Sequence, residues 1–115
     1  MIQRIDPGPR MSDAVVHNGV VYLAGQVASG NAMDIGGQTR EVLAAIDALL
    51  AKAGTDKSRV LRAQIFLADM ADFPGMNAVW DQWVVPGHTP ARATVQAALA
   101  KPQWKVEIVI TAALP

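Results

Sequence analysis

Two lone charges, Arg92 and Glu107, stand in stretches that otherwise have the composition of buried strands. Charged side chains are almost never fully buried unless they are paired. The Arg guanidinium is a planar fork of five donors that matches a carboxylate two bonds at a time. Arg92 stands near the start of a predicted strand, two residues after the rigid Pro90, and it favours a small carboxylic acid as ligand. A structural ion pair, or a strand-end Arg that reaches solvent, is the alternative.

The separation of these two charges depends on how the last two predicted strands pair. A simple hairpin that turns at Ala100–Gln103 would place Arg92 and Glu107 about five residues, or ~17 Å, apart along the strand axis, too far for a salt bridge. We expect both on the same face and closer together, through a bulge near Ala98, because unpaired charges that point into apolar layers would be costly. A solvated edge-strand carboxylate is the alternative for Glu107.

Two uncharged polar residues are further candidates. Asn77 lies between Phe73 and Trp80 at helical spacing, so its amide points from the apolar stripe of a predicted helix. It either makes a satisfied core hydrogen bond or offers a donor to a ligand. Thr94 shares the predicted face of Arg92 and supplies a hydroxyl group there, although an ordinary polar strand position explains it equally well.

Composition and charge restrict the class of protein. Ten Lys and Arg residues balance ten Asp and Glu residues, so no broad basic field attracts nucleic acid or anionic lipid. The absence of cysteine removes thiolate catalysis and Cys-type zinc sites, and His17 and His88 lack the spacing of metal ligands. The first residues lack the apolar stretch of a signal peptide. We expect a soluble, cytoplasmic protein with a small ligand or a protein partner and no bound metal.

Local signals predict the secondary structure. Asn18-Gly19 is a strong hairpin signal, because both turn positions need a positive φ. Gly54 can end a first helix, and Asp72 can cap a second whose first turn tolerates Pro74. The expected elements are strands at Ala14–His17 and Val20–Ala24, a helix with Val42, Leu43, Ile46, Leu49 and Leu50, a strand at Val60–Leu67, a helix with Phe73, Met76, Trp80, Trp83 and Val84, and strands at Pro90–Ala97 and Lys105–Ile110.

The resulting order, β-β-α-β-α-β-β, predicts one α+β domain over residues 1–115, a mixed sheet with both helices on one face. Two helices cannot also cover the other face. Apolar residues nevertheless occupy both alternation phases of the strands, as in sheets that are buried on two sides. The uncovered face is therefore expected to meet another copy of the chain, with ligand sites between subunits.

This order of elements and two segments resemble the RidA (YjgF/UK114) family, most closely its YoaB-type bacterial members. The segments are His88 to Val95, which contains Pro-Ala-Arg, and Lys105 to Ile108, which contains Val-Glu-Ile. The similarity runs from about Gly8 to Ala112, and Gly25-Gln26, Asp72-Phe73 and Asn77 also fall where the family pattern has them.

The resemblance implies a chorismate-mutase-like fold, a homotrimer with clefts between subunits, and a reaction. The reaction is hydrolysis of 2-imino or enamine acids, such as 2-aminoacrylate, to 2-oxo acids and ammonia without a cofactor. The resemblance assigns the substrate carboxylate to Arg92 and the attacking water to Glu107. It also places Thr94 and Gly25 in the substrate-binding cleft, together with Asn77 from a neighbouring subunit.

Three wall positions depart from the better-studied deaminases that the chain resembles. Those proteins have a tyrosine near Met11, a serine at Ala24 and a cysteine at Thr94. The carboxylate-binding half of the pocket thus keeps the family pattern better than the rest of the pocket does. Two other functions are alternatives. One is a non-catalytic trimer that binds a small 2-oxo acid. The other is an endoribonuclease, which zero net charge, few aromatic residues and the absence of paired catalytic histidines disfavour.

Overall fold

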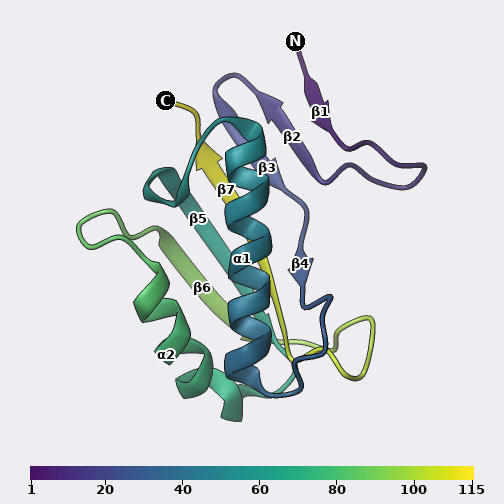
Figure 1. Ribbon diagram of the computed structural model, residues 1–115, viewed down its shortest axis with the longest axis vertical. Coiled ribbons are helices and arrows are strands. Elements are labelled where there is room, and N and C mark those ends of the chain that lie inside the picture. The colour runs from purple at the N-terminus through teal and green to yellow at the C-terminus, as the bar shows by residue number, and fades with distance from the viewer.

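One mixed sheet of seven strands and two α-helices on one of its faces make up the chain in a computed structural model that describes residues 1–115 (Figure 1). Two short 3₁₀ turns, Lys57–Arg59 and Met70–Asp72, join elements. The elements are β1 (Gln3–Ile5), β2 (Ala14–His17), β3 (Val20–Leu23), β4 (Gln26–Val27), α1 (Ile35–Ala53), β5 (Val60–Leu67), α2 (Phe73–Trp83), β6 (Ala91–Gln96) and β7 (Val106–Ala113).

The predicted first hairpin is confirmed. β2 and β3 pair antiparallel, with His17 opposite Val20, and the turn residues Asn18 and Gly19 have φ values of 51° and 76°. Both values lie in the left-handed region that Asn and Gly tolerate best. The hairpin therefore follows from local backbone chemistry.

Both predicted helices are present. Gly54 ends α1 with φ 89°, and its N–H reaches the carbonyl oxygens of Leu50 and Ala51. Asp72 is the N-cap residue of α2 and Pro74 lies in its first turn, as expected, but the Asp72 side chain makes no capping hydrogen bond. Asp72 belongs to the preceding 3₁₀ turn, where the Asp69 carboxylate accepts from the Ala71 N–H at 2.9 Å. None of the helices combines the length and the apolar composition that a membrane crossing needs.

The strand order, β1-β2-β3-β7-β5-β6 with β4 beside β7, contradicts the closing hairpin. β6 and β7 are not neighbours, because β5 lies between them, parallel to β6 and antiparallel to β7. The chain reaches β6 from β5 through α2, and a helical crossover of this kind leaves its two strands parallel. The short strands β1 and β4 were not predicted.

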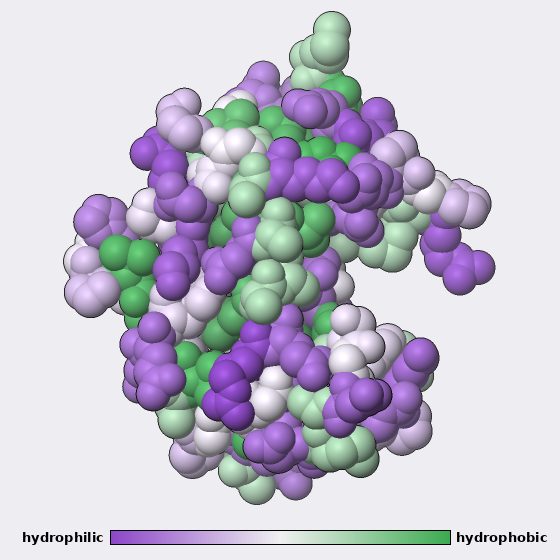
Figure 2. Space-filling model, viewed as in Figure 1, coloured by the Kyte–Doolittle hydropathy of each residue, from purple (hydrophilic) through white to green (hydrophobic).

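The two faces of the sheet differ in cover. Val106, Ile108 and Ile110 of β7 are fully buried beneath the helices, whereas the alternate residues of that strand are only half-buried. On this second face, called the open face below, Tyr22 and Val95 are 48% and 45% exposed. Figure 2 shows hydrophilic and hydrophobic residues interspersed over the helix side. No helix of the chain covers the apolar residues of the open face.

Candidate functional site

Arg92 lies on the edge strand β6 and points toward the helices. It pairs with the fully buried Ala63 of β5, which faces the core. The guanidinium Cζ lies 5.2 Å from the ring centroid of Trp80 and 5.7 Å from that of Phe73, within the range of cation–π attraction. No Asp or Glu pairs with it, since the salt bridge of the chain is that between Lys52 and Asp6. Its hydrogen-bonding fork is thus not used by a carboxylate of its own chain.

Thr94 and Asn77 add unpaired polar atoms to this side of the sheet. Thr94 pairs with the core residue Ile65, so it shares the face of Arg92, as expected. Its Oγ1 is buried without a hydrogen-bond partner, and so is the Oδ1 of Asn77. In the sequence of α2, Asn77 lies between Phe73 and Trp80, whose rings contact Arg92. Buried polar atoms are rarely left unpaired. The core hydrogen bond that was the alternative for Asn77 is therefore not made by its oxygen.

Glu107 lies on the open face of the sheet, away from Arg92, Thr94 and Asn77. It pairs with Phe66 of β5 and lies against Gly25. A Cβ at position 25 would stand 3.0 Å from the Glu107 Cδ and closer still to its Oε2, so the carboxylate occupies space that only glycine leaves free. A shallow hollow of ≈ 230 Å³ begins here, lined by Phe66, Ala97, Ala98, Leu99, Ala100 and Glu107.

The expectation that Arg92 and Glu107 share a face is wrong. Their partners on β5, Ala63 and Phe66, are separated by an odd number of positions, and side chains alternate between faces along a strand. Along the strand direction the two charges are roughly 10 Å apart, instead of the hairpin value. One chain therefore cannot place both groups on the two ends of one small acid.

Comparison with known proteins gives matches over nearly the whole chain. A family model described as Endoribonuclease L-PSP matches residues 1–114. The chain belongs to this family. A RutC family protein from Haemophilus ducreyi is 53% identical over 114 residues, covering 99% of this chain and 97% of that protein. RutC family protein YoaB from Escherichia coli is 52% identical over 113 residues, covering 98% of each.

A solved structure shows which known fold this L-PSP family member has. The crystal structure of a YjgF family protein from Neisseria meningitidis matches with a TM-score of 0.98 at 50% identity, covering 100% of this chain and 96% of that one. The α+β fold with two helices and a mixed sheet is thus that of YjgF structures. The predicted membership of the RidA (YjgF/UK114) family, close to YoaB, is confirmed.

The positions at which this chain departs from the deaminases it resembles are also located. Met11 lies in the loop between β1 and β2 with its side chain 56% exposed, and Ala24 is half-buried between β3 and β4, next to Gly25. The Ala24 side chain has no hydrogen-bonding group, and that of Met11 has only a weakly accepting sulfur. Of these two residues, Ala24 is the one next in the chain to Gly25, which lies against Glu107.

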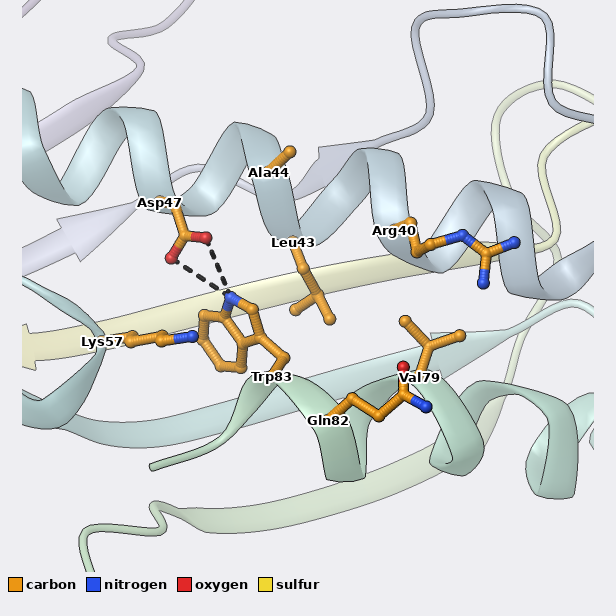
Figure 3. A pocket seen from close by; sticks show the side chains of 8 residues that line it. All are labelled: Arg40, Leu43, Ala44, Asp47, Lys57, Val79, Gln82 and Trp83. Carbon is orange, nitrogen blue, oxygen red and sulfur yellow. Dashed lines mark hydrogen bonds between the residues drawn. The ribbon is translucent and has the colours of Figure 1, made fainter. Parts of the chain in front are cut away.

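A groove of ≈ 250 Å³ between α1 and α2 lies apart from these residues (Figure 3). Both carboxylate oxygens of Asp47 accept from the Trp83 Nε1–H at 3.1 Å, and the Lys57 ammonium lies 5.5 Å from the Trp83 ring centroid. Figure 3 shows the Arg40 guanidinium directed away from the indole. The charged groups do not converge on one point, so we assign the groove a structural role in joining the helices.

Asp47→Ala is expected to destabilise the fold by about 1 kcal/mol, because the half-buried indole N–H of Trp83 loses its acceptor. Asp47→Asn keeps an acceptor oxygen and should recover most of that loss. Urea unfolding of both variants and the wild type at one protein concentration measures the difference. Equal stability of the Ala and Asn variants would show that the hydrogen bond contributes nothing.

Two features of the site are not predicted from the sequence. Phe73 and Trp80 contact Arg92, whereas their spacing predicts only an apolar stripe of the helix. Gln38 is 2% exposed and is one of the few buried polar residues. A signal existed for Gln38, which lies one helical turn before Val42 on the apolar face of α1.

Proposed function

We propose that this protein hydrolyses reactive 2-imino and enamine acids, such as 2-aminoacrylate, to 2-oxo acids and ammonia. The observation that supports the proposal most is the state of Arg92. Its guanidinium is half-buried, stacked near two aromatic rings and free of any carboxylate of its own chain. A desolvated Arg fork of this kind matches the carboxylate that all these substrates carry.

The active assembly in this proposal is a homotrimer with a cleft between each pair of subunits. Arg92 and Glu107 lie on opposite faces of one sheet, so a single substrate can meet both only if two chains supply them. The exposed Tyr22 and Val95 give the open face an apolar surface for such contact. The number three and the chorismate-mutase-like arrangement rest on the family resemblance. Light scattering tests the number of subunits.

In the proposed reaction, Arg92 binds the substrate carboxylate and Glu107 acts as the general base. Glu107 takes a proton from water as the water oxygen bonds to the imine carbon, and the nitrogen gains a proton. Collapse of this adduct breaks the carbon–nitrogen bond, forms the carbonyl group and releases ammonia. The net change is imine plus water to 2-oxo acid plus ammonia, with no cofactor. Asn77 and Thr94 would then offer their unpaired oxygens to the bound substrate.

Ammonia release from enzymatically generated 2-aminoacrylate tests this function. The wild-type protein is expected to release ammonia well above the rate in buffer. The Arg92→Ala variant is expected to release it at a rate close to that in buffer. If the wild-type rate equals the rate in buffer, the deaminase proposal is rejected.

Gly25→Ala is expected to lower ammonia release at least about tenfold, because the new methyl group displaces the Glu107 carboxylate. The displaced atoms are the far end of a flexible side chain, so the fold should tolerate the change. The control is the double variant Gly25→Ala with Glu107→Ala. It should be no slower than Glu107→Ala alone, whereas additive losses would mean that Gly25 acts independently of Glu107.

A second candidate function is binding of a small 2-oxo acid without turnover. Met11 and Ala24 favour it, because neither supplies a strong hydrogen-bonding group at positions where the deaminases that the chain resembles have a tyrosine and a serine. Calorimetry with 2-oxobutanoate and pyruvate, beside the ammonia assay, separates the two functions. Binding that depends on Arg92 in a protein that releases no ammonia would favour this candidate, and absence of such binding would reject it.

The description of the matched family names an endoribonuclease, but we do not propose RNA cleavage for this chain. Its formal net charge is zero, and its two histidines lie on β2 and in the loop before β6. RNA binding normally needs a basic surface. Salt-dependent RNA binding followed by cleavage would overturn this choice. The absence of cysteine fits a reducing compartment, and we propose a cytoplasmic location, which cell fractionation tests.

A further inference from the structure

The segment that links β6 to β7, called the 97–105 loop below, forms one wall of the hollow beside Glu107. The sheet holds it at both ends. The Ala97 N–H donates to the Leu67 oxygen at 2.9 Å, and the Lys105 oxygen accepts from the Ala68 N–H at 3.0 Å. The loop ends two residues before Glu107, so its position bears directly on that carboxylate.

The side chain of Gln38 holds this loop from the helix side. Gln38 lies in the first turn of α1 and is 2% exposed. Its Nε2–H donates to the Gln103 oxygen at 2.9 Å, and its Oε1 accepts from the Lys105 N–H at 2.8 Å. The Nε2 group also donates to the Ala32 oxygen at 3.3 Å. One buried amide thus joins the 97–105 loop to the segment that follows β4.

Packing alone does not hold these two segments together. A hollow of ≈ 530 Å³ lies between them, lined by residues 27–33 on one side and by Lys101, Gln103 and Trp104 on the other, with Gln38 as part of its wall. Besides Gln38, the Trp104 Nε1–H bridges the segments by donating to the Ala28 oxygen at 3.1 Å. Figure 1 shows the loop beside the first turn of α1 and the end of β4. Across this hollow, the hydrogen bonds of Gln38 and Trp104 therefore tie the loop to the segment that follows β4.

We propose that Gln38 is a positioning residue of the site, which holds the 97–105 loop and thereby the wall beside Glu107. This inference rests on the proposed function. Only a side chain with a donor and an acceptor on one planar group can serve both the Gln103 oxygen and the Lys105 N–H. Gln38→Leu removes both functions. Gln38→Glu keeps an acceptor for the Lys105 N–H, but as a carboxylate it turns acceptor oxygens toward the Ala32 and Gln103 oxygens.

Gln38→Leu is expected to lower kcat between about tenfold and 100-fold, because the wall beside the Glu107 carboxylate shifts. KM should change less than about threefold, because Arg92, which binds the substrate, is not affected. Hydrogen exchange of the peptide that covers the 97–105 loop should become faster. The matched control is Glu41→Ala, which loses the bonds from the Gly30 and Ala32 N–H groups at 2.9 and 3.2 Å but contacts no residue of that loop by hydrogen bond. It should leave both the kcat and the loop exchange near wild-type values.

Gln38→Glu keeps the proposal testable if the Leu variant fails to fold. A buried carboxylate that faces carbonyl oxygens has a raised pKa, and its protonated form regains an O–H donor. The kcat of this variant, relative to wild type at the same pH, should therefore rise as the pH falls. If the ratio of variant to wild-type kcat does not change with pH, and hydrogen exchange of the 97–105 loop is that of the wild type, the proposal is overturned. Failure of the proposed function would show instead as no ammonia release by the wild type, and loop exchange would still test the role of Gln38.

Discussion

Arg92→Ala is expected to reduce kcat/KM for 2-aminoacrylate on the order of 100-fold. The variant removes two charge-assisted hydrogen bonds to the substrate carboxylate, together worth about 3 kcal/mol. The stack with Phe73 and Trp80 preorganises this guanidinium, at 5.7 and 5.2 Å from the ring centroids, so little ordering remains to be done on binding. Ammonia release at several substrate concentrations measures the effect, and calorimetry should show the same loss of affinity for 2-oxobutanoate.

Two further variants show whether the fork or only the charge matters. Arg92→Lys keeps a positive charge but loses the planar fork, so it should restore only a small part of the activity. Arg40→Ala removes an equal charge from the exposed side of α1 and should act like wild type. If Arg40→Ala loses as much activity as Arg92→Ala, net charge rather than a specific contact carries the effect.

Glu107→Gln is expected to lower kcat by about 10²–10⁴-fold, the usual contribution of a general base, while binding of 2-oxobutanoate stays within about twofold of wild type. The amide fills the same space beside Gly25 but cannot take the proton from water. Single-turnover ammonia release and calorimetry on the same preparation separate chemistry from binding. This split is the sharpest distinction between the deaminase and the non-catalytic binding protein.

Asp6→Asn is the matched control for Glu107→Gln, since it also replaces one carboxylate by an amide. Asp6 forms an exposed salt bridge with Lys52 at 2.6 Å, and its φ of 49° is one that Asn tolerates well. Its kcat should remain that of wild type. Loss of ligand affinity in Glu107→Gln, in parallel with its activity, would assign Glu107 to binding and remove it as the base.

Local signals predicted most of the elements correctly. The β2–β3 turn needs positive φ at Asn18 and Gly19, α1 ends where Gly54 adopts φ 89°, and β5 covers the predicted Val60–Leu67. In each case the deciding interaction lies within a few residues along the chain. The capping of α2 was predicted only in part, because Asp72 stands at the N-cap without a side-chain hydrogen bond and is itself the last residue of a 3₁₀ turn that Asp69 caps.

The relation of Arg92 to Glu107 could not be predicted in this way. Sequence neighbours pair in most sheets, so a closing hairpin was the natural expectation. β5 lies between the two strands instead, and the register against Ala63 and Phe66 decides the faces. A shift of one residue would have moved either side chain to the other face. No local pattern in β6 or β7 carries that information.

By itself, the sequence determined most of the elements, the apolar core pattern and the candidate residues for binding a small carboxylic acid, because these depend on residue type and short-range spacing. Only the tertiary structure decided that Arg92 lies among the rings of α2 while Glu107 lies against Gly25 on the open face. It also decided that Gln38 holds the 97–105 loop, through residues far away in the sequence. The physical reason is that strand order and register follow from packing across the whole sheet, which distant segments determine together.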